Sequence, residues 1–342
     1  MVSASANGSS GNGPAPRVLQ WAQEHGEVGG VHASHRQLTA ALRADGLDVR
    51  YVDTGDAARA LRSVPVVWRR RSLHLFHITR LWRAIVLAPV FALVPGRTVL
   101  VLHSGSTAGQ VARMGAAAAV ALRAALHAYD EVWAVNDEIR SVLPRSLQAR
   151  VRVVTPYVPV PRTSAAPPRE PHALAVATNA GLAHYHADLA VEAVRLLRAG
   201  AWPDATLRVL AYGRDGGELA ALRAQVAGEE WVRVTFDSSP EEVREVLASS
   251  AVFLRPTAWD GDSVIVREAL AEGARVVAGD TSPRPVGVEL SALAAADLAG
   301  AVTGGGRPSD GGGLAQLSML DAARASVAAL RARTARGVRS GH

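Results

Sequence analysis

Short apolar runs alternate with amphipathic stretches along most of this 342-residue chain, and this alternation limits its fold more than any other feature. Over residues 17–157 the runs have the length of buried strands, and the segments between them carry apolar residues at helical spacing. Strands that alternate with helices in this way form a parallel sheet with helices on both faces. The pattern predicts strands at 18–22, 49–52, 73–78, 99–102, 131–135 and 151–154, and helices at 31–44, 79–93, 109–128 and 137–143.

Six prolines fall between residues 155 and 171, which is the composition of a linker between domains. After it the pattern restarts, with strands predicted at 173–177, 206–210, 232–236, 252–254 and 275–278. We therefore predict an α/β chain with two doubly wound, Rossmann-like domains that face one cleft. The expected parts are a disordered tail (1–16), an N-terminal domain (17–155), the linker (156–171), a C-terminal domain (172–303), a glycine-rich loop (304–313) and a final helix (314–335).

The amino-acid composition narrows the chemistry that the chain can perform. The absence of cysteine excludes disulfides, thiolate metal sites and a cysteine nucleophile, and it suits a reducing cytoplasm. Lysine is also absent, so all 37 basic residues are arginines, and a phosphate-binding cation must be Arg or His. Residues 1–16 lack the apolar segment of a signal peptide, and the longest apolar run, 84–94, is too short to span a membrane. We therefore predict a cytoplasmic protein.

The net charge of +6 is concentrated in residues 57–129, which hold ten arginines and no acidic residue. Such a stretch favours an anionic partner, and the Trp- and Arg-containing apolar segment 81–91 suggests a helix at a membrane interface on the inner face of the plasma membrane. An anionic membrane surface or a phosphate-bearing acceptor fits better than nucleic acid, because no nucleic-acid motif is present. The alternatives are a solvated face enriched in arginine by coding bias, and a helix that only packs on the core.

The strongest functional motif is a strand, a polar loop and a helix around Asp260 and Glu268. The loop opens the helix, where Asp262 or Ser263 would be the N-cap, so backbone N–H groups at the helix start are free to face the cleft. Glu268 follows Asp260 by eight positions, a spacing that can aim one carboxylate at a sugar ring and the other at ribose hydroxyls. An ordinary capped helix with two surface carboxylates is the alternative.

This segment resembles the E-x7-E region of the large family of retaining GT-B glycosyltransferases often called family 4. Asp260 takes the first acidic position and Glu268 the second; Gly273 and residues 276–278 also match, and Arg275 stands where that family has proline. The resemblance implies a GT-B fold whose first domain binds a saccharide or lipid-linked acceptor and whose second domain binds a nucleotide-sugar donor. It implies hexose-type transfer to an acceptor hydroxyl, in polysaccharide, glycolipid or natural-product glycoside synthesis. Neither a metal nor a cofactor is expected, since the nucleotide sugar is a substrate.

Two features of the first domain extend the resemblance. Gly29 and Gly30 lie between the first strand and its helix, where glycines permit close backbone approach to an anion. The resemblance places this loop near the donor diphosphate or the acceptor. His103 ends an apolar strand, and the resemblance gives it a contact with the transferred sugar. His77 ends the preceding strand, and for it a hydrogen-bonded strand-end role is favoured over a place in the cleft.

The sequence departs from that family where the leaving diphosphate requires positive charge. The family has an Arg and a Lys-Gly after the first strand of the second domain, whereas this chain has Asn179 and, near the second position, Tyr185 between two histidines. Arg255 or Arg214 would have to supply the charge. The His-x-His pair lacks the partners of a metal site, so we predict no metal.

The predicted catalytic residues are therefore His103 and Asp260, and the predicted donor-binding residues are Gly29, Gly30, Asn179, Arg255, Asp262, Ser263 and Glu268. Two alternatives to a transferase stay open. One is a non-catalytic GT-B protein that binds a nucleotide sugar or an active partner, which the missing Arg/Lys pair favours. The other is a nucleotide-sugar 2-epimerase.

Overall fold

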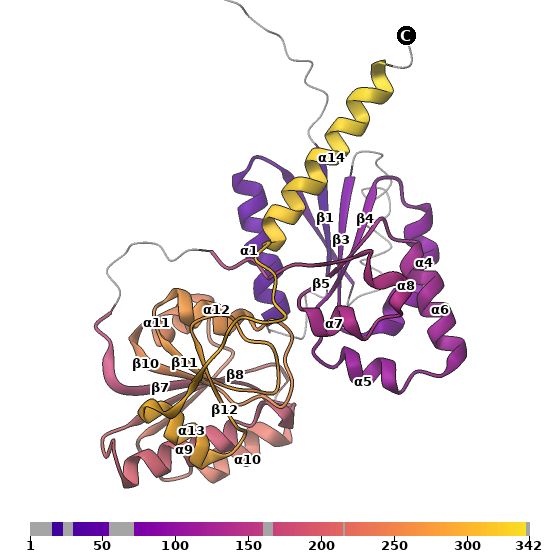
Figure 1. The fold of residues 1–342 in the computed structure, drawn as a ribbon. Helices are drawn as coiled ribbons and strands as arrows, with labels where there is room; N and C mark the ends of the chain where they lie inside the picture. The colour runs from indigo at the N-terminus through magenta and orange to yellow at the C-terminus, as the bar shows by residue number, and fades with distance from the viewer. Residues whose placement is uncertain (1–15, 23–29, 55–71, 160–166, 215, 340–342) are drawn as a thin grey trace, which may run out of the picture.

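The chain forms two α/β domains, each built on one sheet (Figure 1). The structure is a computed structural model that describes residues 16–22, 30–54, 72–159, 167–214 and 216–339. Gly29, and residues 57–71 of the arginine-rich segment, lie outside these ranges. The predicted class of two doubly wound, Rossmann-like domains is confirmed.

The first domain holds a six-stranded parallel sheet in the order β2-β1-β3-β4-β5-β6. Its strands are β1 (Arg17–Ala22), β2 (Asp48–Asp53), β3 (Ser72–Ile78), β4 (Arg97–Leu102), β5 (Glu131–Ala134) and β6 (Val151–Val153). Its helices are α1 (Gly30–Ala44), α4 (Leu81–Leu93), α5 (Thr107–Ala112), α6 (Ala116–His127), α7 (Asp137–Ser141) and α8 (Arg145–Gln148). The central strands are continuous apolar runs because a parallel sheet is buried on both faces, and Leu75 and Leu100 have no exposed surface.

The second domain holds a seven-stranded sheet in the order β13-β12-β11-β10-β7-β8-β9, parallel except for the β12–β13 pair. Its strands are β7 (Glu170–Asn179), β8 (Thr206–Tyr212), β9 (Val232–Phe236), β10 (Ser250–Arg255), β11 (Arg275–Gly279), β12 (Val288–Ser291) and β13 (Arg307–Pro308). Its helices are α9 (Ala187–Ala199), α10 (Gly217–Gln225), α11 (Pro240–Ser249), α12 (Val264–Ala271) and α13 (Ala295–Gly300), with a short turn of 3-10 helix, η1 (Ala183–Tyr185), and a π-helical turn, η2 (Ala301–Gly305). The strand order reverses between β7 and β10.

Several elements differ from the sequence-based predictions. The single helix expected at 109–128 is two helices, α5 and α6, because Gly115 breaks it in an extended conformation. β12 and β13 were not predicted, and β13 lies inside the expected glycine-rich loop. β13 has two exposed residues and no apolar pattern, so only its pairing with β12 reveals it. β7 begins at Glu170, inside the range expected for the linker.

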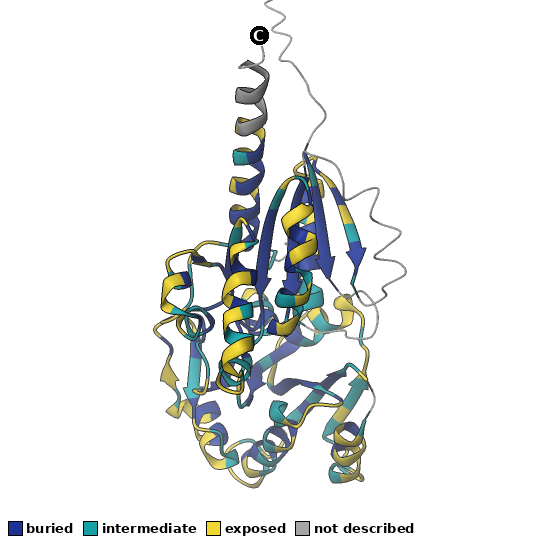
Figure 2. Cartoon of the chain, turned by 90° about the vertical axis from the view of Figure 1, so that its right-hand side faces the viewer, coloured by how far each residue is buried: buried dark blue, intermediate teal, exposed yellow. Residues whose placement is uncertain are grey.

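The last helix, α14 (Met319–Arg339), returns to the first domain and runs beside its sheet (Figure 1). The chain enters this helix along Thr155, whose backbone N–H donates to Leu317 O at 2.9 Å and whose carbonyl accepts from Met319 N at 2.8 Å. Figure 2 shows the buried positions that α14 contributes to the first core, which include Met319, Ala323 and Val327. The first domain is therefore completed by residues that follow the second.

Candidate functional site

The reversal of strand order between β7 and β10 defines the candidate site, because ligands of open α/β sheets bind beyond the strand ends at such a reversal. β7 ends at Asn179 and β10 ends at Arg255, so two predicted donor-binding residues flank it. The Asn179 side chain turns back, and its Oδ1 accepts from Gly181 N at 3.0 Å. Asn179 therefore shapes the loop that follows β7.

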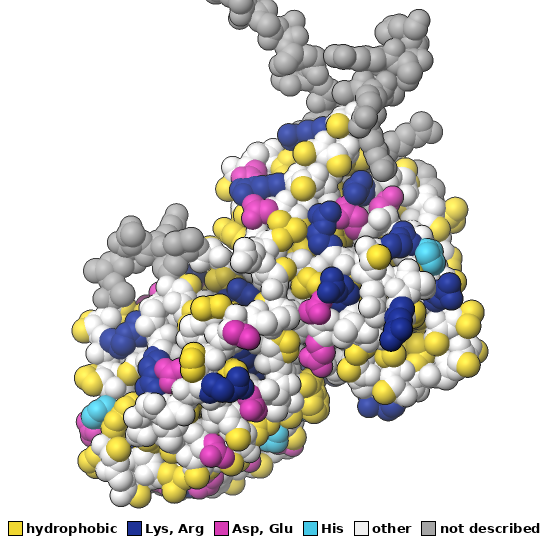
Figure 3. All heavy atoms as spheres, viewed as in Figure 1, with side chains coloured by type: hydrophobic (Ala, Val, Ile, Leu, Met, Phe, Trp, Pro, Cys, Tyr) yellow, Lys and Arg dark blue, Asp and Glu magenta, His cyan; other side chains and the backbone are white. Residues whose placement is uncertain are grey.

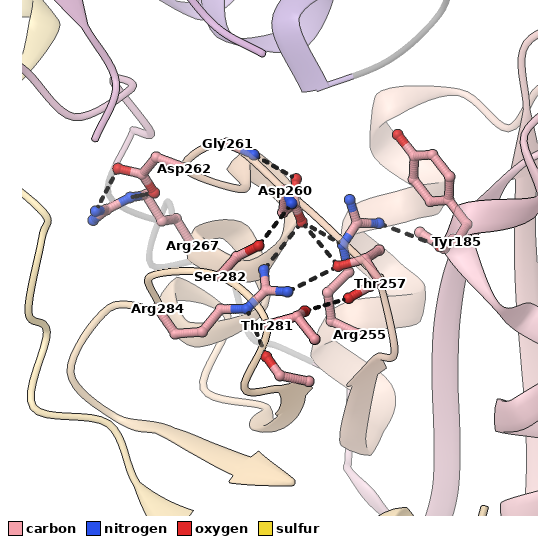
Figure 4. A network of polar contacts seen from close by, with 12 residues as sticks. Tyr185, Arg255, Thr257, Asp260, Gly261, Asp262, Arg267, Thr281, Ser282 and Arg284 are labelled. Carbon is pink, nitrogen blue, oxygen red and sulfur yellow. Dashed lines mark hydrogen bonds and ion pairs between the residues drawn. The ribbon is translucent and has the colours of Figure 1, made fainter. Parts of the chain in front are cut away.

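Asp260 lies between two buried arginines (Figure 4). Its Oδ2 accepts hydrogen bonds from Arg255 Nε at 2.9 Å and from Arg284 Nη1 at 3.0 Å. Arg284 has no exposed side-chain surface, and it also donates to Thr257 Oγ1 at 2.8 Å and to the Gly279 carbonyl at 3.3 Å. Burial by itself raises the pKa of Asp260, but the two guanidinium groups outweigh it and hold that pKa at about 2. Asp260 is therefore ionised at neutral pH.

This cluster of two arginines and one aspartate carries an excess of positive charge. Arg255 donates from Nη1 to the Ala177 carbonyl at 3.3 Å, whereas its Nη2 meets no acceptor within the described ranges. Its guanidinium carbon stands 4.8 Å from the ring centroid of Tyr185, whose hydroxyl accepts from Tyr212 at 2.8 Å. A guanidinium edge with a free N–H beside a strand reversal suits an anionic ligand.

Asp262 and Ser263 lie where the loop enters α12. Both Asp262 carboxylate oxygens accept from Arg267, at 2.6 and 2.7 Å, and the Asp262 side chain is fully buried. Ser263 is the N-cap residue, as the sequence suggested, but its side chain makes no cap hydrogen bond. The Ser263 side chain therefore leaves the first backbone N–H groups of α12 free for another acceptor.

An aromatic pair adjoins Asp260 in the sequence and the fold. The ring of His184 stacks on Trp259 with centroids 4.1 Å apart and an 11° angle between the rings. Burial and the nearby Arg255 lower the pKa of His184 to about 4, so this ring is neutral at pH 7. Trp259 remains 44% exposed and presents apolar surface next to the charged cluster.

Glu268 contacts the first domain. Gln37 on α1 donates from Nε2 to Glu268 Oε1 at 2.5 Å. The two helices approach closely here, because a Cβ on Gly30 would stand only 3.6 Å from the Cβ of Val264. Burial raises the pKa of Glu268, and the bond from Gln37 offsets part of that rise. The second acidic residue of the motif therefore lies where α1 meets α12.

A second contact between the domains joins the loop after β4 to the loop of Asp260. A Cβ on Gly105 would stand 2.2 Å from Asp260 O, and one on Gly261 would stand 2.4 Å from His103 O. No side chain fits at either distance, so glycine at both positions lets the loops touch. The structure thus brings the backbones of the two predicted catalytic residues, His103 and Asp260, together.

The His103 side chain points into the first domain. Its Nε2 lies 2.8 Å from His77 Nδ1, and His77 Nε2 lies 3.1 Å from Gln20 Oε1. Burial lowers the pKa of His103 to about 4, and burial together with the neighbouring histidines lowers the pKa of His77 well below its usual value. His77 is thus a hydrogen-bonded strand-end residue, the alternative that its sequence favoured.

Three partners of the predicted residues had no usable signal in the sequence. Arg284 stands in a Ser-Pro-Arg-Pro turn outside any helix or strand, whereas Gln37 and Gln20 are polar residues within a helix and a strand. Arg214, the other cation considered for the diphosphate, is exposed. Within the ranges described, no cluster of three or more His, Asp or Glu residues could hold a metal ion.

Comparison with known proteins identifies the fold. No protein-family model and no curated protein matches the sequence. Sucrose-phosphate synthase from Thermosynechococcus elongatus superimposes with a TM-score of 0.61 and 15% identity, over 95% of this chain and 100% of that one. The N-terminal domain of Candida albicans trehalose-6-phosphate phosphatase gives 0.58 and 9%, over 94% of each chain.

A third similar structure is the pneumococcal O-GlcNAc transferase GtfA in complex with UDP and GlcNAc. It gives a TM-score of 0.54 and 16% identity, over 71% of this chain and 52% of that one, so this chain spans about half of its length. Identities this low establish the fold alone. The chain therefore has the GT-B fold, the architecture of nucleotide-sugar glycosyltransferases.

Proposed function

We propose that this chain is a glycosyltransferase that moves a sugar from a nucleotide diphosphate sugar to an acceptor hydroxyl. The observation that carries the proposal is the contact between two loops from opposite domains. The loop with Asp260 belongs to the strand reversal of the second sheet, and it touches the loop with His103, at the end of a strand of the first. A donor held at the reversal therefore has its reacting end at the domain contact.

Charge in the second domain supports a diphosphate ligand. The residues after β7 supply no cation, and Arg255 brings one to the same place from β10. Arg284 shares the single negative charge of Asp260 with Arg255, so this carboxylate neutralises the positive charge of Arg255 only in part. In our proposal the free Nη2 of Arg255 and the amide groups at the start of α12 stabilise the leaving diphosphate.

The remaining polar groups bind the sugar and the ribose. Asp260 Oδ2 is occupied by the arginines, whereas among the described residues Oδ1 accepts only from Gly261 N at 3.1 Å and keeps capacity for a sugar hydroxyl. Asp262 and Ser263 contribute backbone amides beside it. Glu268 takes the ribose hydroxyls when Gln37 releases it. The resemblance also assigns Gly30, and Gly29 outside the described residues, to the diphosphate.

The proposed reaction breaks the bond between the sugar C1 and the diphosphate oxygen, and the electron pair leaves with the diphosphate. The acceptor oxygen bonds to C1, and its proton passes to the departing diphosphate. Retention of configuration and a role in polysaccharide, glycolipid or natural-product glycoside synthesis belong to this proposal through the resemblance around Asp260 and Glu268. His103 and Asp260 contact the transferred sugar, and Asn179 shapes the donor loop.

We propose that the acceptor of the first domain is lipid-linked, because the outer side of α4 is apolar and exposed. Trp82, Val86, Val90 and Leu93 recur at helical spacing there and are 49 to 71% exposed. Arg83 lies over the Trp82 ring, and Figure 3 shows arginines among apolar side chains on the visible face of this domain. The opposite side of α4 packs on the core, as the core-facing interpretation expects, and contact of the outer side with a membrane interface is part of our proposal.

In the described part of the chain, no helix combines the length and the apolar character needed to cross a bilayer. Peripheral attachment to the cytoplasmic face of a membrane is part of the proposal because of the exposed apolar side of α4 and its arginine. Co-sedimentation with phosphatidylglycerol vesicles, compared with phosphatidylcholine vesicles, tests it. Binding to the anionic vesicles that is lost in Trp82→Ser/Leu93→Ser supports attachment, whereas equal recovery in all supernatants contradicts it.

The donor site is tested by binding. We expect one member of a panel of UDP-, GDP-, ADP- and TDP-sugars to raise the melting temperature, and Glu268→Gln to weaken its binding about tenfold, the worth of one hydrogen bond to a charged group. Arg324→Lys, near the start of α14 in an exposed pair with Asp45, is the control. A panel without any effect would contradict the proposal.

A further inference from the structure

A chain of hydrogen bonds crosses the strand reversal of the first sheet, which falls between β1 and β3. It runs from Gln20 on β1 through His77 on β3 to His103 after β4. Gln20 has no exposed surface, and His77 and His103 are 5% and 7% exposed. A chain so well buried permits proton positions to be assigned from its partners.

The amide of Gln20 has one possible orientation. The end that faces α1 lies 3.3 Å from the carbonyl of His35 and 2.9 Å from Thr39 Oγ1. A carbonyl only accepts, and the Thr39 hydroxyl gives its own proton to the same carbonyl at 2.8 Å. This end of Gln20 is therefore the Nε2 donor, and the other end, which faces His77, is the Oε1 acceptor.

The orientation of Gln20 fixes both imidazoles. His77 Nε2 must carry a proton to donate to Gln20 Oε1 at 3.1 Å. His77 is neutral because burial and the neighbouring histidines lower its pKa, so its Nδ1 is bare and accepts from His103 Nε2–H at 2.8 Å. His103 is neutral as well, since burial lowers its pKa, and its proton is already placed on Nε2.

We propose that Gln20 and His77 are positioning residues that hold His103 with its proton on Nε2 and its lone pair on Nδ1, where it accepts a hydrogen bond from a ligand hydroxyl. The inference rests on the proposed function only for the identity of that hydroxyl as one of a sugar. Within the described ranges Nδ1 has no protein partner, so it is the atom of this ring left for a ligand.

The bare Nδ1 of His103 also determines which ligand groups this position excludes. A bare nitrogen lone pair repels a phosphate or carboxylate oxygen and attracts an O–H or N–H group. An anion at this position would instead select a protonated ring, which the burial of His103 disfavours. The position beside His103 Nδ1 is therefore a hydroxyl subsite, separate from the proposed anion subsite at Arg255.

Nitrogen-15 NMR of ring-labelled histidine tests the tautomer directly, with His103→Asn used to assign the signal. In the full-length protein near neutral pH we expect the His103 Nε2 to give a protonated signal and Nδ1 a bare one. Gln20→Met and His77→Phe each remove one link, so both should give His103 a mixture of tautomers. A proton on Nδ1 in the unaltered protein would overturn the inference, and the only variant that this arm needs is His103→Asn, for the assignment.

Tyr51→Phe is the matched control. It removes a hydroxyl that lies 3.0 Å from His35 Nε2, within the same cluster but outside the chain, and it should leave the His103 signals unchanged. An unchanged His103 tautomer in both Gln20→Met and His77→Phe, with native melting behaviour, would also overturn the positioning role.

A second arm separates this inference from the proposed function. UDP-glucose, UDP-N-acetylglucosamine, GDP-mannose and ADP-glucose are each added, with UDP, GDP and ADP as controls. The nucleotide sugar that binds should shift the bare Nδ1 signal, and its nucleoside diphosphate alone should not. If the diphosphate alone produces the same shift, the hydroxyl subsite is wrong. If the tautomer is as assigned but no nucleotide sugar binds, the proposed function fails while the positioning role stands.

Discussion

Gln37 on α1 and Glu268 on α12 form a hydrogen bond of 2.5 Å that joins the two domains. Glu268 is the residue to which the motif assigns the ribose of the donor, and in the unliganded chain a side-chain amide takes that place. In the proposed donor complex Gln37 releases Oε1, so that both carboxylate oxygens bind the ribose hydroxyls. The domain contact and the proposed donor site thus share Glu268 Oε1.

Removal of the Gln37 amide, which competes with the donor for Glu268, should tighten donor binding. In Gln37→Ala we expect the dissociation constant for the cognate nucleotide sugar to fall about fivefold, because a hydrogen bond worth about 1 kcal/mol no longer has to be broken. Isothermal titration calorimetry measures it. Arg36→Ala, the exposed neighbour on α1, is the control and should bind as the unaltered protein does. Weaker binding in Gln37→Ala would show that the bond supports the site.

Loss of the Asp260 charge should destabilise the second domain. Asp260→Asn leaves two buried arginines without their shared counter-ion, and breaking a buried ion pair from one side costs about 3–5 kcal/mol. Urea denaturation of the full chain gives the change in the free energy of unfolding. Asp45→Asn removes an exposed partner of Arg324 and should change it little. Equal stability of the two variants would contradict the description of the Arg255–Asp260–Arg284 cluster.

Mild acid should destabilise the first domain. The folded-state pKa is about 3 for His35 and about 4 for His103, below the ordinary value of 6.5, chiefly through burial. The unfolded chain therefore binds more protons, and the stability due to neutral rings is present above pH 6.5 and lost as the pH falls towards 4. Between about pH 7 and about pH 5, each such ring should cost about 2 kcal/mol.

Denaturation at both pH values tests this dependence. His127→Gln, at an exposed position on α6, should retain the full loss of stability in acid. A free energy of unfolding that is the same at both pH values would mean that the buried histidines are not held neutral.

A positive charge alone should not replace the guanidinium group of Arg255 in diphosphate binding. Arg255→Lys keeps a cation but loses the planar group that contacts Asp260, the Ala177 carbonyl and the Tyr185 ring together. We expect the affinity for the free nucleoside diphosphate to fall about tenfold, or about 1.4 kcal/mol. Arg214→Lys, in the exposed loop after β8, is the matched control. If Arg214→Lys is the variant that loses affinity, the cation of the diphosphate site has been misassigned.

The sequence was most informative where a pattern is local. All six predicted strands of the first domain match observed strands within two residues at both ends, as for 73–78 and β3, since each is a mainly apolar run between polar segments. The order of those strands follows from packing in space, and so does the position of each reversal. The break at Gly115 was missed because good helix formers lie on both sides of it, Arg113 and Met114 before it and Ala116 after it.

The candidate site residues also divide into positions that a local pattern predicts and contacts that depend on packing. The positions of His103 and Arg255 at strand ends were visible in the sequence, because polar residues there follow buried runs. Their partners were not, since Arg284 meets Asp260 across 24 residues and Gln37 meets Glu268 across 231. Contacts that depend on how two domains or two loops fold together leave no periodic signal in the chain.

The central claim is sugar transfer, and the direct measurement is product formation from the nucleotide sugar that binds. The full-length protein is incubated with that donor, alone and with saccharide and lipid-linked acceptors, and the nucleoside diphosphate and the anomeric configuration of the product are followed by NMR. We predict release of the diphosphate, a product with the donor's configuration, and about tenfold slower formation of both in Glu268→Gln at a donor concentration well below saturation. Tight donor binding without any diphosphate release, with water or with any acceptor, would contradict the account and indicate a GT-B protein that binds without turnover.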